Sequence, residues 1–340
     1  MQDNNANELL KTYLAESDWG KKNLLEQFPV FLQQWLERNL KIIDSDSAGE
    51  AELLHAHQAL NMVLGVDWGG GICETVDINR ARQILDRELY GLSAVKQRIL
   101  EILVQVNRTH TVPAYGILLT GPAGVGKSRL AHTMARLLGM PWASLDMSMI
   151  ATIEALTGTP RLYANARPGA IMQAVCDFGT PHVMYLMNEL DKAWEGGLNG
   201  NPAMVLLSLL DHLGFTDNYL ECTIPTEGIY TVATANQVEK INPSVLSRFT
   251  VIEVPDYTPQ EKAVIFRDFA LPRVLRKLRM KPEECVVTPD AVSRIVEKYE
   301  KKTGCRELEQ EAEHLASHAL YEIEVYGASY VTYRAEDIER

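Results

Sequence analysis

The segment from Gly121 to Ser128, Gly-Pro-Ala-Gly-Val-Gly-Lys-Ser, fits the phosphate-binding pattern G-x-x-x-x-G-K-[ST] in full. Glycines let backbone N–H groups turn toward phosphate oxygens, and the start of the following helix adds a partial positive charge. In this pattern Lys127 neutralises the β- and γ-phosphates, and the Ser128 hydroxyl ligates Mg²⁺. An apolar run over residues 115–120 and a helical run over 128–138 supply the strand and helix that the pattern requires. We therefore predict that ATP or GTP binds to Gly121, Pro122, Ala123, Gly124, Val125, Gly126, Lys127 and Ser128.

A second candidate element is the apolar stretch that begins at Pro181 and ends in Asn188 and Glu189. In such strands the first polar residue is normally an aspartate that holds the hydration shell of Mg²⁺, and the glutamate after it polarises the attacking water. We expect Glu189 to be the general base and Asn188 to contact Mg²⁺ through a bound water. An amide oxygen brings no negative charge, so Asn188 is expected to weaken metal binding and turnover. The alternative is that Glu189 is only a carboxylate at a strand end.

Short apolar runs alternate with helical patterns through the middle of the chain, which predicts an α/β fold with a parallel five-stranded sheet flanked by helices. The predicted strands are 117–119, 142–145, 183–187, 229–233 and 251–254. Before them we expect helices, with an apolar face from Phe28 to Leu40 and a helix cap at Asp77. After Pro255 we expect only helices until about Tyr326, then a β-like segment at 330–333. The predicted domains are an N-terminal helical segment (1–76), the α/β unit (77–255) and a small helical unit (256–340).

Composition excludes several classes of protein. The 340 residues carry 33 Lys and Arg against 45 Asp and Glu, a net charge of −12, which disfavours a main role in binding nucleic acid. No run reaches the ~18 apolar residues of a membrane span, and the N-terminus lacks the order of a signal peptide. The five cysteines are scattered and form no CxxC pair, so neither a disulfide framework nor a zinc ribbon is expected. We expect a cytoplasmic protein with reduced thiols and no membrane contact.

Many ordered segments between about Leu60 and Arg340 resemble the ATPase part of Lon-type ATP-dependent proteases, members of the AAA+ superfamily. Besides the loop at 121–128, the matching segments are 85–92 (LDRELYGL), 163–169 (YANARPG), 188–192 (NELDK), 201–207 (NPAMVLL), 233–236 (ATAN), 246–249 (LSRF) and 303–306 (TGCR). The resemblance implies an AAA+ fold that uses ATP or ADP with Mg²⁺.

The resemblance also implies roles for single residues. Tyr90 and Gly91 would line the adenine pocket, and Asn236 would be sensor 1, which places the lytic water. Arg248 would be the arginine finger that reaches the nucleotide of a neighbouring subunit, and Arg306 would be sensor 2. A planar guanidinium suits the charge that develops on a γ-phosphate. The alternative for each arginine is an exposed surface ion pair.

An arginine finger donated to a neighbour implies that the chain works as a homo-oligomer, by resemblance a hexameric ring with protein substrates in its pore. Tyr163 matches the aromatic position of the pore loop, and Trp194 would lie on a second pore loop. Exposed aromatic side chains on loops suit gripping of many different side chains. The alternative is that both rings pack locally.

Two departures from the family's pattern shape the functional hypotheses. The sequence ends at Arg340, where the family's pattern continues into a Ser-Lys peptidase domain, so we expect no peptide cleavage by these residues themselves. Two alternatives stay open: the peptidase domain has been lost, or it lies beyond this sequence. A separate peptidase or adaptor is a candidate partner. Only about 75 residues precede the ATPase module, and they hold Trp19, Trp35 and Trp68, which we expect to pack inside this protein rather than on a partner. The leading hypothesis is a ring motor that remodels, unfolds or threads proteins. The alternative is a non-catalytic ATP-binding scaffold or switch, marked by Asn188; the net charge disfavours a motor that acts on DNA.

Overall fold

A computed structural model describes residues 8–9, 11–13, 15, 18–69, 75–163, 165–193 and 202–338. The chain forms two compact units that alternate along the sequence. The first comprises Met1–Val76, Ile102–Leu118 and Ala135–Thr250, and the second comprises Asp77–Glu101, Leu119–Met134 and Val251–Arg340.

The central element is a five-stranded parallel sheet with the order β2-β3-β6-β1-β7, which confirms the predicted fold class. Its strands are β1 (Gly116–Thr120), β2 (Trp142–Asp146), β3 (Met184–Asn188), β6 (Tyr230–Ala235) and β7 (Phe249–Glu253). Every residue of β1 and β6 is buried, as expected for parallel strands with both faces covered. The strands begin and end within two residues of the predicted runs, because these runs are short, apolar and bounded by polar residues.

The helices and turns that accompany the sheet follow the predicted alternation. They are α6 (Ser93–Thr109), α7 (Lys127–Leu138), α8 (Glu154–Thr157), α9 (Ala170–Phe178), the turn η1 (Leu190–Lys192), α10 (Pro202–Leu210), η2 (Val238–Lys240) and α11 (Pro243–Leu246). Among the described residues, no helix combines the length and apolar composition needed to cross a membrane.

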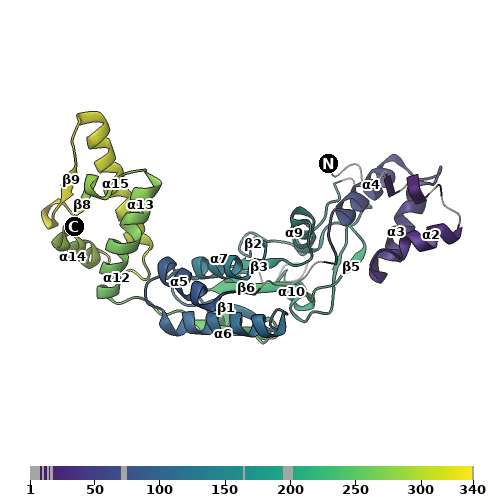
Figure 1. The fold of residues 1–340 in the computed structure, drawn as a ribbon, viewed down its shortest axis with the longest axis horizontal. Coiled ribbons are helices and arrows are strands. Elements are labelled where there is room, and N and C mark those ends of the chain that lie inside the picture. The colour runs from purple at the N-terminus through teal and green to yellow at the C-terminus, as the bar shows by residue number, and fades with distance from the viewer. Residues whose placement is uncertain are drawn as a thin grey trace. The chain divides into compact units, whose positions relative to one another are not determined.

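Three N-terminal helices, α2 (Asp18–Leu25), α3 (Val30–Ile43) and α4 (Glu50–Leu64), belong to the first unit and lie beside a small hairpin (Figure 1). The hairpin pairs β4 (Phe215–Asp217) with β5 (Cys222–Ile224), and α3 contacts β5. The sequence did not predict the hairpin, since strands of three residues leave almost no periodic signal. Trp35 is buried, and the Trp68 ring meets Phe31 edge to face with 5.3 Å between ring centroids. Both tryptophans therefore pack inside this protein as expected; the side chain of Trp19 lies outside the described residues.

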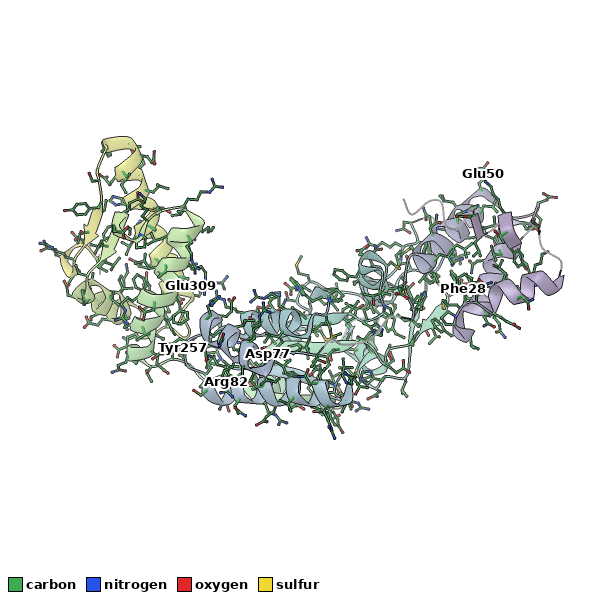
Figure 2. The ribbon with its side chains drawn as sticks, in the orientation of Figure 1. Phe28, Glu50, Asp77, Arg82, Tyr257 and Glu309 are labelled. Carbon is green, nitrogen blue, oxygen red and sulfur yellow. The ribbon has the colours of Figure 1, made fainter. Side chains whose placement is uncertain are left out.

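In the second unit, α5 (Ile78–Glu88) begins directly after Asp77, which is labelled in Figure 2. The Asp77 carboxylate accepts the N–H groups of Asn79 and Arg80. The predicted cap at Asp77 is confirmed. Such a cap contributes about 1 kcal/mol because it satisfies N–H groups that have no partner inside the helix.

The C-terminal part of the second unit is mostly helical. It contains α12 (Pro259–Ile265), the π-helical turn η3 (Phe266–Ala270), α13 (Leu271–Lys277), η4 (Pro282–Glu284), α14 (Pro289–Lys298), α15 (Arg306–Tyr326) and η5 (Ala335–Asp337). The expectation of helices alone as far as Tyr326 was wrong at one place: β8 (Cys285–Val287) pairs in parallel with β9 (Val331–Tyr333). Two prolines, Pro282 and Pro289, bracket this β-branched segment and prevent a continuous helix.

Candidate nucleotide site

The phosphate-binding segment connects β1 to α7 and turns at three glycines with positive φ: 145° at Gly121, 79° at Gly124 and 97° at Gly126. A Cβ at Gly121 would lie 2.1 Å from the carbonyl oxygen of Val254, and one at Gly126 would lie 2.7 Å from a methyl carbon of Leu89. At Gly121 and Gly126, a residue with a side chain would therefore be strained by the positive φ and would also clash with its neighbours. The glycine spacing of the motif corresponds to a real backbone requirement.

Lys127 is the first residue of α7, and only 8% of it is exposed. Its ammonium donates to the carbonyl oxygens of Gly121 and Pro122, with N···O distances of 2.7 and 2.6 Å. The charge is thus held inside the loop. Ser128 follows on the exposed side of the helix start, where a hydroxyl can reach a metal ion.

The proposed adenine-pocket residues, Tyr90 and Gly91, lie in the same compact unit as this loop. The Tyr90 ring packs edge-on against Phe269, with 6.0 Å between centroids. Gly91 lines a pocket of about 600 Å³, a volume in the range of small-molecule sites, together with Glu261 and Tyr257. The Tyr257 hydroxyl donates to the carbonyl of Val125 at 3.1 Å, so a wall of this pocket is tied to the phosphate loop.

The start of α15 also contacts the phosphate loop. The N–H of Cys305 donates to the carbonyl of Gly124 at 3.1 Å, and a Cβ at Gly124 would lie 3.3 Å from the backbone nitrogen of Arg306. Arg306, the sensor 2 candidate, is exposed at this helix start. The structure therefore brings Tyr90, Gly91, the phosphate loop and Arg306 together within one unit.

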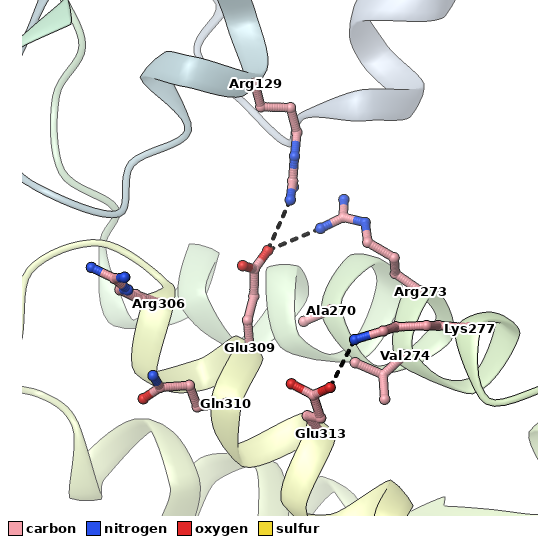
Figure 3. A pocket seen from close by; sticks show the side chains of 9 residues that line it. All are labelled: Arg129, Ala270, Arg273, Val274, Lys277, Arg306, Glu309, Gln310 and Glu313. Carbon is pink, nitrogen blue, oxygen red and sulfur yellow. Dashed lines mark hydrogen bonds and ion pairs between the residues drawn. The ribbon is translucent and has the colours of Figure 1, made fainter. Parts of the chain in front are cut away.

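A pocket of about 300 Å³ next to Arg306 is rich in cations (Figure 3). One carboxylate oxygen of Glu309 accepts hydrogen bonds from Arg129 at 3.1 Å and from Arg273 at 2.9 Å. Burial, and then the nearby charge of Arg129, lower the pKa of Arg273. Since Arg129 follows Ser128 on α7, Glu309 joins the phosphate-loop helix to α13 and α15.

The second group of candidate residues lies at the ends of two paired strands of the first unit. Asn188 ends β3, and its amide nitrogen donates to the hydroxyl of Ser144 at 2.8 Å, which orients the side chain. Glu189 follows with φ = 54°, a left-handed conformation that is rare for residues other than glycine. Its N–H donates to Thr234 at 3.2 Å, and its carboxylate pairs with Lys192 at 2.7 Å. Such backbone strain, of order 1–3 kcal/mol, is concentrated at functional sites in proteins.

Asn236, the sensor 1 candidate, follows β6, the strand next to β3. The N–H groups of Asn236 and Gln237 donate to the same carboxylate oxygen of Asp191, at 3.2 and 3.0 Å. Asp191 is only 9% exposed, and its other oxygen has no hydrogen-bond partner among the described residues. Asp191 therefore fixes the backbone at Asn236. Sequence reasoning missed this residue, although a second carboxylate two positions after Glu189 was a signal.

Comparison with known proteins identifies a family for the α/β part of the chain. Residues 117–256 match the AAA family, described as "ATPase family associated with various cellular activities". Three curated relatives are named as Lon proteases. The chain is 32% identical to "Lon protease homolog, mitochondrial" of Oryza sativa subsp. indica over 293 residues, which cover 85% of this chain and 29% of the relative. It is 32% identical to "Lon protease" of Dictyoglomus thermophilum over 278 residues, which cover 81% of this chain and 35% of the relative. It is 30% identical to "Lon protease 2" of Thermus thermophilus over 326 residues, which cover 92% of this chain and 40% of the relative.

Residues 117–256 therefore form a domain of the AAA family, and the module that contains them is of the Lon type. The chain spans about a third of the length of the curated relatives it matches.

In this Lon-type module, the arginine-finger candidate Arg248 makes a two-point ion pair with Asp211. Its Nε and Nη2 donate to the two carboxylate oxygens at 2.8 and 3.1 Å, and its Nη1 donates to Ser244 and Ser247. The hydrogen bond from Arg248 lowers the pKa of Asp211. Asp211 ends an apolar helix pattern, and nothing in the sequence pairs it with Arg248.

The pore-loop candidate Tyr163 is exposed, as is its neighbour Leu162, at 56% and 89%. More than half of Tyr163 is therefore open to solvent in the described structure. Trp194, the second pore-loop candidate, lies outside the described residues.

Among the described residues, no group of three or more His, Cys, Asp or Glu side chains is arranged to hold a metal ion. Of the two candidate metal contacts, Ser128 is exposed at the start of α7, and the Asn188 amide is oriented by the Ser144 hydroxyl.

Proposed function

We propose that this chain binds and hydrolyses ATP as a subunit of a homo-oligomeric, hexameric ring and uses the energy to remodel, unfold or thread protein substrates. The observation that carries the proposal is the phosphate loop, with its three positive-φ glycines, its enclosed Lys127 and its contact with the start of α15. Membership of the AAA family supports nucleotide binding.

In the proposed binding mode, the N–H groups of the loop and the Lys127 ammonium hold the β- and γ-phosphates. Lys127 would exchange its two backbone carbonyl partners for phosphate oxygens, so it is placed before the ligand arrives. The base would occupy the pocket beside Gly91. Mg²⁺, when bound, would lower the charge on the phosphates, with Ser128 as a direct ligand and Asn188 in contact through a water.

For hydrolysis, Glu189 would take the proton of the attacking water, and Asn236 would orient that water. Glu189 follows β3 and Asn236 follows β6, and these two strands pair in parallel, so the two residues lie at the same end of the strand pair. The strained backbone of Glu189 supports a functional role for this carboxylate.

Arg248 would complete the site of a neighbouring subunit. Its guanidinium is one-third exposed and is oriented by Asp211. An arginine finger of this kind can raise the rate of phosphoryl transfer by a factor of about 10³–10⁵. The same dependence on a neighbour would make hydrolysis require the ring.

Protein substrates would contact the exposed Leu162 and Tyr163. The proposal assigns ATP-driven handling of the polypeptide to these residues, and it leaves peptide cleavage to a peptidase outside them, either a further domain or a separate partner.

Asn188 favours a second candidate function, an ATP-binding scaffold or switch without turnover, since this amide replaces a negative charge near Mg²⁺. Steady-state Mg²⁺-dependent ATP turnover by the assembled ring separates the two. We expect slow, measurable turnover that Asn188→Asp accelerates. Turnover of zero in an assembled wild-type ring that binds ATP would favour the scaffold.

A further inference from the structure

The exposed Leu162 and Tyr163 lie in the loop between Gly158 and Gly169 of the first unit, of which residues 158–163 and 165–169 are described. The two ends of the loop touch: a Cβ at Gly169 would lie 2.5 Å from the nitrogen of Gly158. Inside the loop, Thr159 and Arg167 exchange hydrogen bonds, with the Thr159 N–H donating to the Arg167 carbonyl and the Arg167 N–H donating to the Thr159 hydroxyl, both at 2.9 Å. The loop is therefore held closed by its own hydrogen bonds, and its position depends on the residues that bind its two ends.

The tip of the β4–β5 hairpin holds both ends. Asp217 is fully buried, and one of its carboxylate oxygens accepts the N–H of Gly169 at 2.8 Å, at the end of the loop. Asn218 donates its N–H to the carbonyl of Thr157 at 2.6 Å, just before the loop begins. Burial raises the pKa of Asp217 in spite of the N–H groups that it accepts.

Arg161 links the loop to the same hairpin tip and to the N-terminal helices. Its guanidinium donates to the carbonyls of Tyr219 and Leu220, at 2.6 and 3.2 Å, and to the side-chain oxygen of Asn39 on α3 at 2.8 Å. Asn39 has no exposed surface, and burial lowers the pKa of Arg161. Because this guanidinium is partly buried, the loss of one acceptor is only partly made up by water, and each acceptor helps to hold it in place.

The N-terminal helices in turn fix the hairpin tip. The Trp35 indole N–H on α3 donates to the carbonyl of Leu220, which Arg161 also contacts. On α4, Gln58 accepts the Tyr219 hydroxyl at 3.0 Å, and the His55 ring lies 3.2 Å from the same hydroxyl. Among the described residues, the acceptors of Arg161 thus belong to α3 or to the hairpin turn that α3 and α4 contact.

We infer that helices α3 and α4 position the loop that presents Leu162 and Tyr163 to a polypeptide, and that Asn39 and Arg161 form the positioning pair. The substrate role of the loop rests on the proposed function, whereas the mechanical link between Asn39 and the loop does not. The N-terminal helices thereby gain a role in substrate handling, although they are remote in sequence from residues 158–169.

The link is tested by hydrogen exchange, measured by mass spectrometry, in the full 340-residue chain. Asn39→Ala removes one acceptor of Arg161, and we expect at least tenfold faster exchange of the Thr159, Tyr163 and Ala166 amides, which are hydrogen-bonded within the loop. Asn39→Asp keeps the acceptor for Arg161 and loses only the hydrogen bond to the Trp35 carbonyl, so it should restore most of the protection. Lys41→Ala is the matched control, because it removes only an exposed ion pair with Glu37 inside the same helix.

The role of the positioning pair in substrate handling is tested by measuring ATP turnover of the assembled ring with and without an unfolded polypeptide, reduced and carboxymethylated lactalbumin. We expect Asn39→Ala to keep basal ATP turnover and KM for ATP within about twofold of wild type and to lose most of the polypeptide-stimulated turnover, with rescue by Asn39→Asp. Should Asn39→Ala not fold, Arg161→Lys is measured instead, since one ammonium cannot reach three acceptors in a fixed fork.

Exchange rates equal to wild type in the variant would overturn the positioning link. Faster exchange with unchanged stimulation would overturn the role in substrate handling. Absence of ATP turnover in the wild-type ring would instead overturn the proposed function, and the exchange result would still decide the link.

Discussion

Replacing Asp191 by alanine is expected to loosen the end of β6, where Asn236 lies. The Asp191 carboxylate accepts two backbone N–H groups in a nearly buried position. Hydrogen bonds to a charged group contribute ~1.5–3 kcal/mol each, so the two together contribute about 3–6 kcal/mol. The second oxygen is buried without a partner among the described residues, which costs about 1–3 kcal/mol. The difference between these ranges is about 0–5 kcal/mol, and we expect Asp191→Ala to lower the unfolding free energy by about 2.5 kcal/mol, the middle of that range.

The same change should lower kcat more than it alters binding. If Asn236 orients the lytic water, a displacement of about 1 Å costs on the order of 10²-fold in kcat, while KM for ATP stays within about twofold. Asp191→Asn keeps an acceptor oxygen for the two N–H groups and should show a smaller loss in both measurements. Glu239→Ala, which removes an exposed carboxylate three residues after Asn236, is the matched control.

The assays are urea-induced unfolding and steady-state ATP turnover. Loss of stability without loss of kcat would show that Asp191 is structural only. Unchanged stability and turnover in Asp191→Ala would refute the reasoning from buried hydrogen bonds.

Three further predictions follow from the geometry. Arg248→Ala should leave ATP affinity near the wild-type value and reduce turnover by about 10³-fold, as measured by nucleotide binding and steady-state kinetics; an equal loss of affinity would show that this residue is misassigned. Glu309→Gln breaks the ion pairs of Glu309 with Arg129 and Arg273, whose side chains are only about one-third exposed. This change should lower the free energy of unfolding, measured in urea, by about 1–2 kcal/mol. Glu313→Gln is the control and should lower it less, because it breaks only the exposed pair with Lys277. Burial raises the pKa of Cys222 and Cys285 to about 11 and of Cys176 and Cys305 to about 12. Thiols of the unfolded chain ionise near pH 9, whereas the buried thiols of the folded chain stay protonated, so the folded state should lose stability as the pH rises from about 9 toward 11–12. The expected loss of unfolding free energy at pH 10.5 is about 1–2 kcal/mol per thiol. Equal urea midpoints at pH 8 and pH 10.5 would contradict this prediction.

The parts of the molecule that the sequence predicts well are those with local causes. The glycines of the phosphate loop are needed by the loop's own backbone, and the cap at Asp77 binds N–H groups two and three residues away. The five sheet strands are continuous apolar runs, which local hydrophobicity marks directly.

The contacts that sequence reasoning missed join residues far apart in the chain. Arg161 and Asn39 are separated by 122 positions, Arg129 and Glu309 by 180, and Arg248 and Asp211 by 37. Each of these residues is also an ordinary surface-type residue in its local window, so its partner is set only by tertiary packing. The three-residue strands of the hairpin and of β8 escape prediction for a related reason: their pairing partners, not their own sequence pattern, define them.

The most direct test of the account compares wild type with Glu189→Gln, with Mg²⁺-ATP binding and turnover measured in the same ring preparation. The account predicts slow turnover in wild type, and in the variant it predicts unchanged ATP affinity with no detectable turnover. Turnover at the wild-type rate in Glu189→Gln, or a wild-type chain that does not bind ATP, would contradict it.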